Sequence, residues 1–199
     1  MRGMRLCLLV VAACHAPSDA PHVMMDFTRA NLFDAPVPAD DLMGSVTIDN
    51  SLDLPIVGQV QQLLGDTNGF ATTGGVFFQT SVAIDPTGLP DIPTSATADS
   101  PAFVIGIDPA APDFGTRYPL EVSFEPQGDR YGAPNLVTLL PVQGMPLRPN
   151  TRYAAVLTTD LHATTGEPLA ATSIANAPEV GVDPSRIAGI TEFTTGDPT

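Results

Sequence analysis

Few side chains in this sequence could combine a nucleophile with a base. The nearest approach is Asp160 with His162, which a Ser-His-Asp arrangement would use, but no Gly-x-Ser-x-Gly is present to supply the nucleophile. Two residues so close at the end of a strand do not set the geometry of a triad. His15 and His22 fall in a Pro-rich stretch near the amino terminus. We therefore interpret His162 as a solvated turn residue and expect no catalytic residue and no cofactor.

The acidic stretch "DNSLDLPI", which begins at Asp49, could supply oxygen ligands for calcium. Asp49, Ser51 and Asp53 occupy the first, third and fifth places of a calcium-binding loop. Leu54 stands where such a loop has glycine, and Val60 stands where it has a bidentate glutamate. The better interpretation is a helix cap in a solvated loop. Neither a His/Cys cluster for zinc nor a phosphate-binding loop is present in the sequence, so we predict no metal site.

Cys14 carries the thiol with the clearest chemical context. Arg2 and Arg5 precede an apolar run that ends in the letters "VAAC". Positive charge, an apolar run and then small residues is the order of an export signal. The run is too short to cross a bilayer, which takes about 20 apolar residues. We predict that residues 1–13 are a signal peptide that is removed before folding.

The residues from Val11 to Cys14 resemble a bacterial lipobox. The resemblance implies that Cys14 is the lipid attachment residue: its thiol is acylated, the peptide bond before it is cut, and the acyl chains hold the protein to a membrane. His15 follows where inner-membrane lipoproteins commonly have aspartate, which favours the outer membrane or cell surface of a bacterium. Cys7 would leave with the signal, so one cysteine remains and no internal disulfide can form.

Composition narrows the classes of partner. The 199 residues leave 186 once 13 are removed, enough for one sizeable domain. Acidic residues number 22 against 8 basic ones, none of them lysine, and the net charge of −14 becomes −16 without Arg2 and Arg5. Such a chain repels phosphate backbones and anionic headgroups. Nucleic acid is therefore excluded as a partner, and any membrane contact must come from acyl chains.

The amino-terminal third is predicted to contain little regular structure. Closely spaced prolines predict a tether over residues 14–40, of which "NLFDAPVPADDL" has apolar residues that could dock on the edge of a domain. Residues 41–69 form an N-terminal extension with one short amphipathic helix. Asp53 is its N-cap, Pro55 lies in its first turn and Gly65 ends it. Its apolar face consists of Ile56, Val57, Val60, Leu63 and Leu64.

From residue 70 to residue 197 the apolar period becomes two, which predicts strands. In "PLEVSFE" the residues Leu120, Val122 and Phe124 alternate with polar ones, as in a half-buried antiparallel strand. "RYAAVLTT" is apolar on both faces and should be central. The predicted fold class is all-β, an antiparallel β-sandwich. Its other strands lie in "GGVFFQTSVAID", with Val76, Phe78, Thr80, Val82 and Ile84 on one face, and in "FVIGID", "NLVTLLPV" and "ITEFTT", the last one short.

The run "PLRPNTRYAAVLTTDLHATTGEPL", followed by "EFTTGD", resembles the C-terminal half of bacterial immunoglobulin-like domains of exported and surface proteins. The family pattern is Pro-Leu-x-Pro-x-Thr-x-Tyr, an apolar strand, a Gly-x-Pro-Leu turn and a closing Phe-Thr-Thr. This chain departs from it in the turn, where "LHATTG" stands instead of an aspartate turn, and in the stretch "DPAAPDFGTRYPLEVSFEPQGDRYGAPN", which is longer than the usual hairpin. The matching residues are Leu147, Pro149, Thr151, Tyr153, Gly166, Pro168, Leu169, Phe193, Thr194 and Thr195.

The stretches "TNGFATTGGVFF" and "VPADDL" are similar to the N-terminal region of bacterial lipase-type lipoproteins. Two hypotheses follow. The first is a non-catalytic, lipid-anchored surface module that spaces, presents or binds. The second is the front end of an exported lipase or esterase whose catalytic domain, downstream in the same polypeptide, lies beyond Thr199. A nucleophile motif in the reading frame beyond Thr199 would favour the second.

The resemblance and the alternation together predict a core. Tyr153 should bury its ring while its hydroxyl reaches a backbone group, as tyrosines of sandwich domains do. Gly166 should permit a turn before Pro168. Tyr153 and Phe193 are placed on the closing strands. The other large core residues are predicted to be Phe78, Val122, Phe124, Leu139, Val156 and Leu157.

Overall fold

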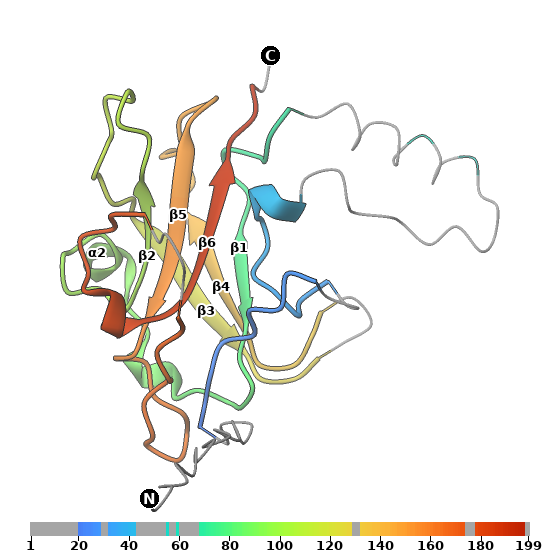
Figure 1. The fold of residues 1–199 in the computed structure, drawn as a ribbon, viewed down its shortest axis with the longest axis vertical. Coiled ribbons are helices and arrows are strands. Elements are labelled where there is room, and N and C mark those ends of the chain that lie inside the picture. Colours follow the sequence, from blue (N-terminus) through green and yellow to red (C-terminus); the bar gives the residue numbers. More distant parts are fainter. Residues whose placement is uncertain are drawn as a thin grey trace, which may run out of the picture.

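The structure, a computed structural model, describes residues 20–28, 32–42, 55, 59, 68–128, 132–173 and 178–197. Two antiparallel three-stranded sheets face each other, one with the order β1-β4-β3 and the other β2-β5-β6 (Figure 1). The predicted all-β sandwich is confirmed. In chain order the described elements are η1 (Asp40–Leu42), β1 (Val76–Gln79), η2 (Pro86–Gly88), α2 (Ile92–Ser95), β2 (Ala102–Gly106), β3 (Leu120–Glu125), β4 (Leu136–Pro141), β5 (Arg152–Thr158), η3 (Pro184–Arg186) and β6 (Ile187–Thr194).

The main core lies between the sheets and is built from the alternation that the sequence shows. Phe78, Leu139 and Leu157 are buried there as predicted. Val122 and Phe124, which were also predicted for the core, pack against it but are only half-buried. The physical reason is their strand: β3 pairs with β4 on one side only and lies at the end of its sheet.

The central position predicted for "RYAAVLTT" is confirmed. β5 pairs with β2 on one side and with β6 on the other, and every residue from Tyr153 to Thr158 is buried. Neighbouring residues of β5 serve different cores: Leu157 faces the other sheet, whereas Val156 belongs to a second cluster with Phe103 and Ile190. Val180 packs in that second cluster, so this sheet is covered on both faces.

Two strands differ in extent from the sequence prediction. β1 ends at Gln79 because the hydroxyl of Thr80 donates to the carbonyl of Val82 at 2.7 Å and turns the chain. Val82 is consequently 36% exposed rather than on the buried face. β6 was expected to be short, but it runs over eight residues from Ile187, because the apolar residues before "ITEFTT" extend it.

Residues 20–28 and 32–42, here called the N-terminal strap, lie along the sandwich instead of hanging free as a tether. Val37 exchanges backbone hydrogen bonds with Phe77 of β1, and the amide of Met24 donates to Gln79. Val23 and Leu42 are buried. The docking predicted for "NLFDAPVPADDL" is confirmed for its described residues, 32–42, and it extends to residues 20–28, which were assigned to the tether.

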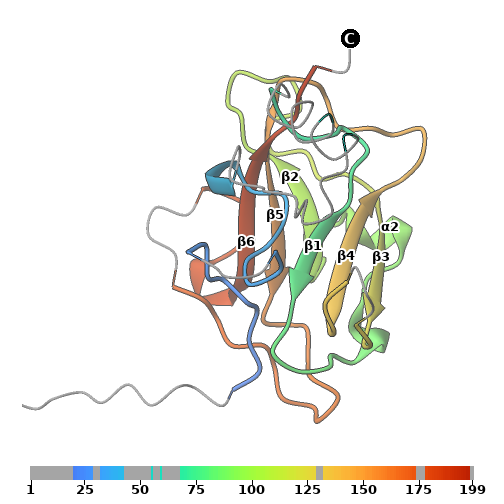
Figure 2. The same ribbon diagram turned by 90° about the vertical axis from the view of Figure 1, so that its right-hand side faces the viewer.

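The strap also contacts the second sheet, so it joins the two layers. The amide and hydroxyl of Thr194 donate to the carboxylate of Asp40, each at 2.7 Å, and the hydroxyl of Thr191 donates to the carbonyl of Pro38 at 2.6 Å. Figure 2 shows the strap running upward beside β6 and β1. Of the helix predicted after Asp53, only Pro55 and Gln59 are described, and both are helical.

Candidate functional site

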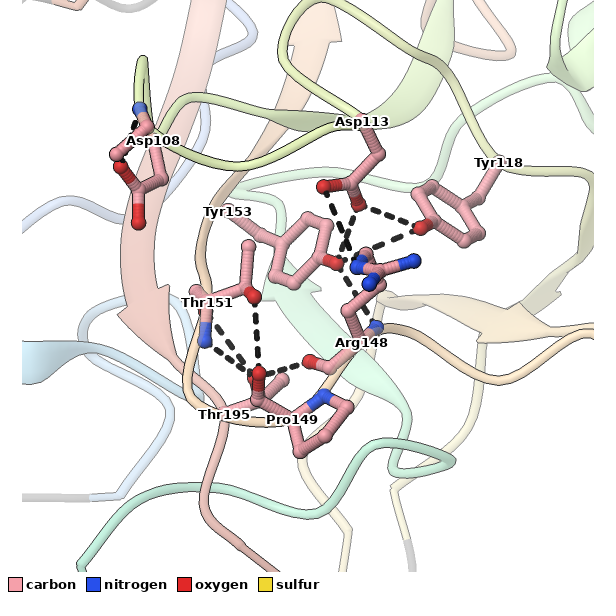
Figure 3. A network of polar contacts seen from close by, with 9 residues as sticks. Asp108, Asp113, Tyr118, Arg148, Pro149, Thr151, Tyr153 and Thr195 are labelled. Atoms are coloured by element: carbon pink, nitrogen blue, oxygen red, sulfur yellow. Dashed lines mark hydrogen bonds and ion pairs between the residues drawn. The ribbon is translucent and has the colours of Figure 1, made fainter.

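A cluster of polar side chains lies where β2 and β5 meet their connecting loops (Figure 3). The carboxylate of Asp113 accepts hydrogen bonds at one oxygen, Oδ2, from the hydroxyls of Tyr118 at 2.6 Å and Tyr153 at 2.7 Å. The two tyrosine rings stand edge to face with centroids 5.6 Å apart. Nε of Arg148 lies 4.0 Å from the other oxygen, Oδ1.

The loop after β2 carries Asp113 inward because the backbone there folds tightly on itself. Gly115 donates to the carbonyl of Gly106 at 2.9 Å, and a Cβ added at Gly106 would lie 2.5 Å from the carbonyl oxygen of Asp113. A glycine is therefore required at position 106 for the close approach. Asp113 is only 9% exposed as a result. Nothing in the spacing of the sequence identified it.

Tyr153 satisfies the sequence prediction. Its ring is fully buried, and its hydroxyl accepts a hydrogen bond from the backbone amide of Arg148 at 2.9 Å, five residues upstream. This backbone contact is the tyrosine-corner arrangement of sandwich domains. The bond to Asp113 is additional, so one hydroxyl ties the turn before β5 to the loop after β2.

The Thr residues of the family-like pattern close the same corner. The amide of Thr151 donates to the hydroxyl of Thr195 at 3.1 Å, and that hydroxyl donates to the carbonyl of Arg148. The hydroxyl of Thr151 donates to Pro149 at 2.9 Å. The matching residues in "PLRPNTRY" and "FTT" therefore have a structural role: they hold the turn before β5 against the end of β6.

The electrostatics of the cluster fix its protonation. Burial alone would raise the pKa of Asp113, but the hydrogen bonds from Tyr118 and Tyr153 and the charge of Arg148 outweigh it and lower that pKa. Burial, followed by hydrogen bonding within the cluster, raises the pKa of Tyr118 and, much more strongly, that of Tyr153. At neutral pH the group therefore consists of one carboxylate and two neutral phenols.

This protonation decides what the cluster can do. A phenol with a raised pKa is a poor nucleophile and a poor base, and a carboxylate already held by two donors is poorly placed to accept a proton from a substrate. The geometry suits a structural lock between two loops. Oδ1 of Asp113 is buried without a hydrogen bond, and its charge is balanced by Arg148.

The pair Asp160 and His162 does not form a catalytic arrangement. Asp160 forms an ion pair with Arg186, and both side chains are about half exposed. The backbone carbonyl of His162 accepts from the amide of Asp85 at 2.8 Å, while its side chain is exposed beside an open hollow of about 320 Å³. The interpretation of His162 as a solvated turn residue is confirmed. Gly166 in the same turn has a φ of +90°, as the turn prediction requires.

Several predicted residues lie outside the described part of the chain. They include Cys14, for which lipid attachment stays a prediction, and the rejected calcium ligands Asp49, Ser51 and Asp53. Within the described ranges, no group of three or more His, Cys, Asp or Glu side chains gathers closely enough to hold a metal ion. Among those same residues no helix has the length and apolar character needed to cross a bilayer.

Comparison with known proteins yields distant likenesses only. No family model and no curated protein matches the chain. It is similar to a structure of domains 1–6 of the surface layer protein SbsC, with 13% identity and a TM-score of 0.33 over 78% of this chain and 18% of that one. It is also similar to the N-terminal part of the bacterial S-layer protein SbsC, with 12% identity and a TM-score of 0.31 over 78% of this chain and 31% of that one. The chain spans less than a third of either, and likeness of this degree carries no functional conclusion.

Proposed function

We propose that this protein is a non-catalytic, lipid-anchored module of a bacterial cell surface that holds whatever follows it at a distance from the membrane. The observation that carries the proposal is the placement of the described ends. The blue beginning of the N-terminal strap and the red end of the chain after β6 lie toward opposite ends of the long axis in both views (Figures 1 and 2). A chain anchored through Cys14 and continued after β6 would therefore run the length of the sandwich.

The N-terminal strap suits this role because it makes the first part of the chain an integral piece of the domain. Its contacts reach both sheets, from Val37 on Phe77 to Asp40 on Thr194. The strap and β6 run in the same direction. A force that pulls the beginning of the strap away from the end of β6 therefore acts along both segments and perpendicular to the hydrogen bonds that join them. Bonds loaded in this way share the force instead of opening one at a time.

The remaining support is that the described residues form no catalytic arrangement. The polar cluster is a lock, His162 is a solvated turn residue, and no buried nucleophile lies beside a base there. The strongly acidic composition suits a soluble, exposed surface. A lipase domain beyond Thr199 is a compatible continuation, and no observation on the described residues favours it.

The proposal is tested in intact bacteria that express the full chain with an epitope tag after Thr199. The tag should be accessible to antibody on whole cells and should fractionate with the outer membrane. The matched variants are Cys14→Ser, which should lose membrane fractionation, and His162→Ala, which should behave as the wild type. A tag that reaches antibody only after lysis, or a Cys14→Ser protein that fractionates like the wild type, would contradict the proposal.

A further inference from the structure

Three of the four outer strand edges in the two sheets are covered by other described segments. The strap borders β1 through Val37 and borders β6 through Asp40. The loop before β3 borders β2, where the amide of Tyr118 donates to the carbonyl of Val104 at 3.1 Å. The fourth edge belongs to β3, which Figure 2 shows at the end of its sheet with α2 beside it.

The direction of each backbone group in this sheet follows from one pair of bonds. Phe77 and Val37 exchange amide-to-carbonyl hydrogen bonds at 2.7 and 3.0 Å, so the amide and carbonyl of Phe77 point away from β4. Thr138 is the partner of Phe77 on β4, and it is also the partner of Ser123 on β3. Because hydrogen-bonded pairs alternate along an antiparallel ladder, Thr138 must bond to Ser123.

The same alternation leaves the backbone groups of Val122 and Phe124 pointing outward from the free edge. Leu120, which has the same parity, confirms this direction: its amide points away from β4 and donates to the hydroxyl of Ser95 at 2.8 Å. No described residue hydrogen-bonds to the amides or carbonyls of Val122 and Phe124. α2 therefore caps the beginning of this edge, and no described segment pairs with the rest of it.

The side chains along β3 show the same incomplete cover. Leu120, beside α2, is fully buried, whereas Val122 and Phe124 face the same core and are only half-buried. The core is thus covered at the beginning of β3 and partly exposed to solvent further along the strand. An added strand would bury the exposed parts of Val122 and Phe124 as well as pair their backbone groups.

The exposed side chains of β3 carry negative charge. Glu121, Ser123 and Glu125 are exposed and alternate with the two half-buried residues. A strand added beside β3 would place its own outward residues next to the two glutamates, where basic side chains are favoured and acidic ones are repelled.

We propose that the free edge of β3 is a strand-addition site for an extended segment of another polypeptide that alternates apolar and basic residues. The apolar positions pair with Val122 and Phe124, and the basic positions lie beside Glu121 and Glu125. A second copy of this chain fits poorly: two β3 strands centred antiparallel on Ser123 would place glutamate opposite glutamate at both ends, between two chains of net charge −14. The glutamates thus keep the edge from self-pairing while selecting a basic partner.

The probe is a fluorescent, end-capped heptapeptide of alternating lysine and valine, titrated at low salt against the full chain carrying Cys14→Ser. Two control peptides accompany it. One replaces every lysine by glutamate, and the other keeps the lysines but carries N-methyl groups on the valine amides. We expect the first peptide to bind at least ten times more tightly than either control, because one control reverses the charge and the other removes the backbone donors.

The matched variants are Glu121→Lys/Glu125→Lys and, as a control with the same change in net charge, Glu167→Lys/Glu179→Lys, at exposed positions outside β3. The first variant should reverse the preference between the lysine and glutamate peptides, and the second should keep it. Amide hydrogen exchange should show new protection at Val122 and Phe124 when the lysine peptide is bound.

Three outcomes would overturn the proposal. Equal binding of the N-methylated peptide would mean that charge alone attracts the probe. An equal loss of binding in both double variants would mean that the β3 glutamates have no special part. A dimer in sedimentation, with Val122 and Phe124 protected in the absence of peptide, would make a second copy the occupant.

Discussion

The hydroxyl of Tyr153 donates to Oδ2 of Asp113 at 2.7 Å while it accepts from the backbone amide of Arg148 at 2.9 Å. One buried oxygen atom thus connects the turn before β5 to the loop after β2. Residues 40 apart in the sequence are fixed by this contact, and both phenols of the cluster depend on the same carboxylate.

Removal of that hydroxyl should cost more than its small size suggests. Tyr153→Phe leaves Asp113 with one donor and the amide of Arg148 without its acceptor, which should lower the free energy of unfolding by about 1–3 kcal/mol. Tyr153→Ala also removes the buried ring and should cost about 3–5 kcal/mol. His162→Ala should change it by less than about 0.5 kcal/mol, since the side chain is exposed. Urea denaturation of the three variants provides the comparison, and an unchanged midpoint for Tyr153→Phe would contradict the lock.

The stability that the contact between Tyr153 and Asp113 provides should decrease at both low and high pH. The pKa of Asp113 is lowered in the folded state, so its contribution is present above the ordinary carboxyl pKa of about 4 and is lost as pH falls below it. Hydrogen bonds from their own turns also lower the pKa values of Asp85, Asp91 and Asp183. The stability that these three carboxylates contribute to the domain is therefore also lost as pH falls. Asp113→Asn should therefore show a shallower loss of stability between about pH 5 and pH 2.

At high pH the sign is opposite. The pKa of Tyr153 is raised in the folded state, so its contribution is complete below the ordinary tyrosine pKa of about 10 and is lost as pH rises above it. The phenolate of Tyr153 should appear only as the domain unfolds. Denaturant melts across the pH range, with tyrosine absorbance followed in parallel, measure both effects. Ionisation of Tyr153 near pH 10 in the folded domain would contradict the burial of its hydroxyl.

The docking of the strap can be tested by a compensating pair. A Cβ added at Gly189 would lie 2.7 Å from a methyl group of Val23, which is 3% exposed. Gly189→Ala should therefore destabilise the domain by about 1–3 kcal/mol through overpacking. Val23→Ala alone should be destabilising through the cavity that it leaves. The double variant should be more stable than the sum of the two changes implies, with a coupling of about 0.5–3 kcal/mol in thermal melts. Strict additivity would mean that the two residues do not touch.

The sequence predicted the parts of this fold that depend on local pattern. Alternation located β3 and the buried face of β1, and the apolar middle of β5 identified it as central. The partial exposure of Val122 and Phe124 could not be predicted from alternation, because it depends on which strand pairs with β3. The docking of Val23 was likewise hidden, since its partner Gly189 is 166 positions away and glycine leaves no hydrophobic signal.

The polar cluster was only half predictable, for the same reason. Tyr153 follows a recognisable spacing of proline, threonine and tyrosine, and its hydrogen bond to a nearby backbone amide is a local event. Asp113 stands in a loop of no distinctive pattern. Its role arises because Gly106 lets that loop fold back closely, which no linear spacing reveals.

The inventory of the described residues predicts a negative result that is simple to measure. Purified protein from residue 14 to residue 199 should hydrolyse neither short nor long acyl esters above a buffer blank. The reason is that Asp160 is engaged by Arg186, and the phenols of the Asp113 cluster are held neutral. Chromogenic esters of several chain lengths provide the assay. Hydrolysis that disappears in His162→Ala would show that a catalytic site had been missed.

The most direct test of the central claim is the covalent state of Cys14. Bacteria expressing the full chain are grown with a labelled fatty acid, and the protein is recovered by detergent-phase partition and examined by mass spectrometry. The wild type should carry the label, partition into detergent and begin at an acylated Cys14, whereas Cys14→Ser should carry no label and stay in the aqueous phase. A wild-type protein that is soluble, unlabelled and cleaved at another position would contradict the claim that this module is lipid-anchored.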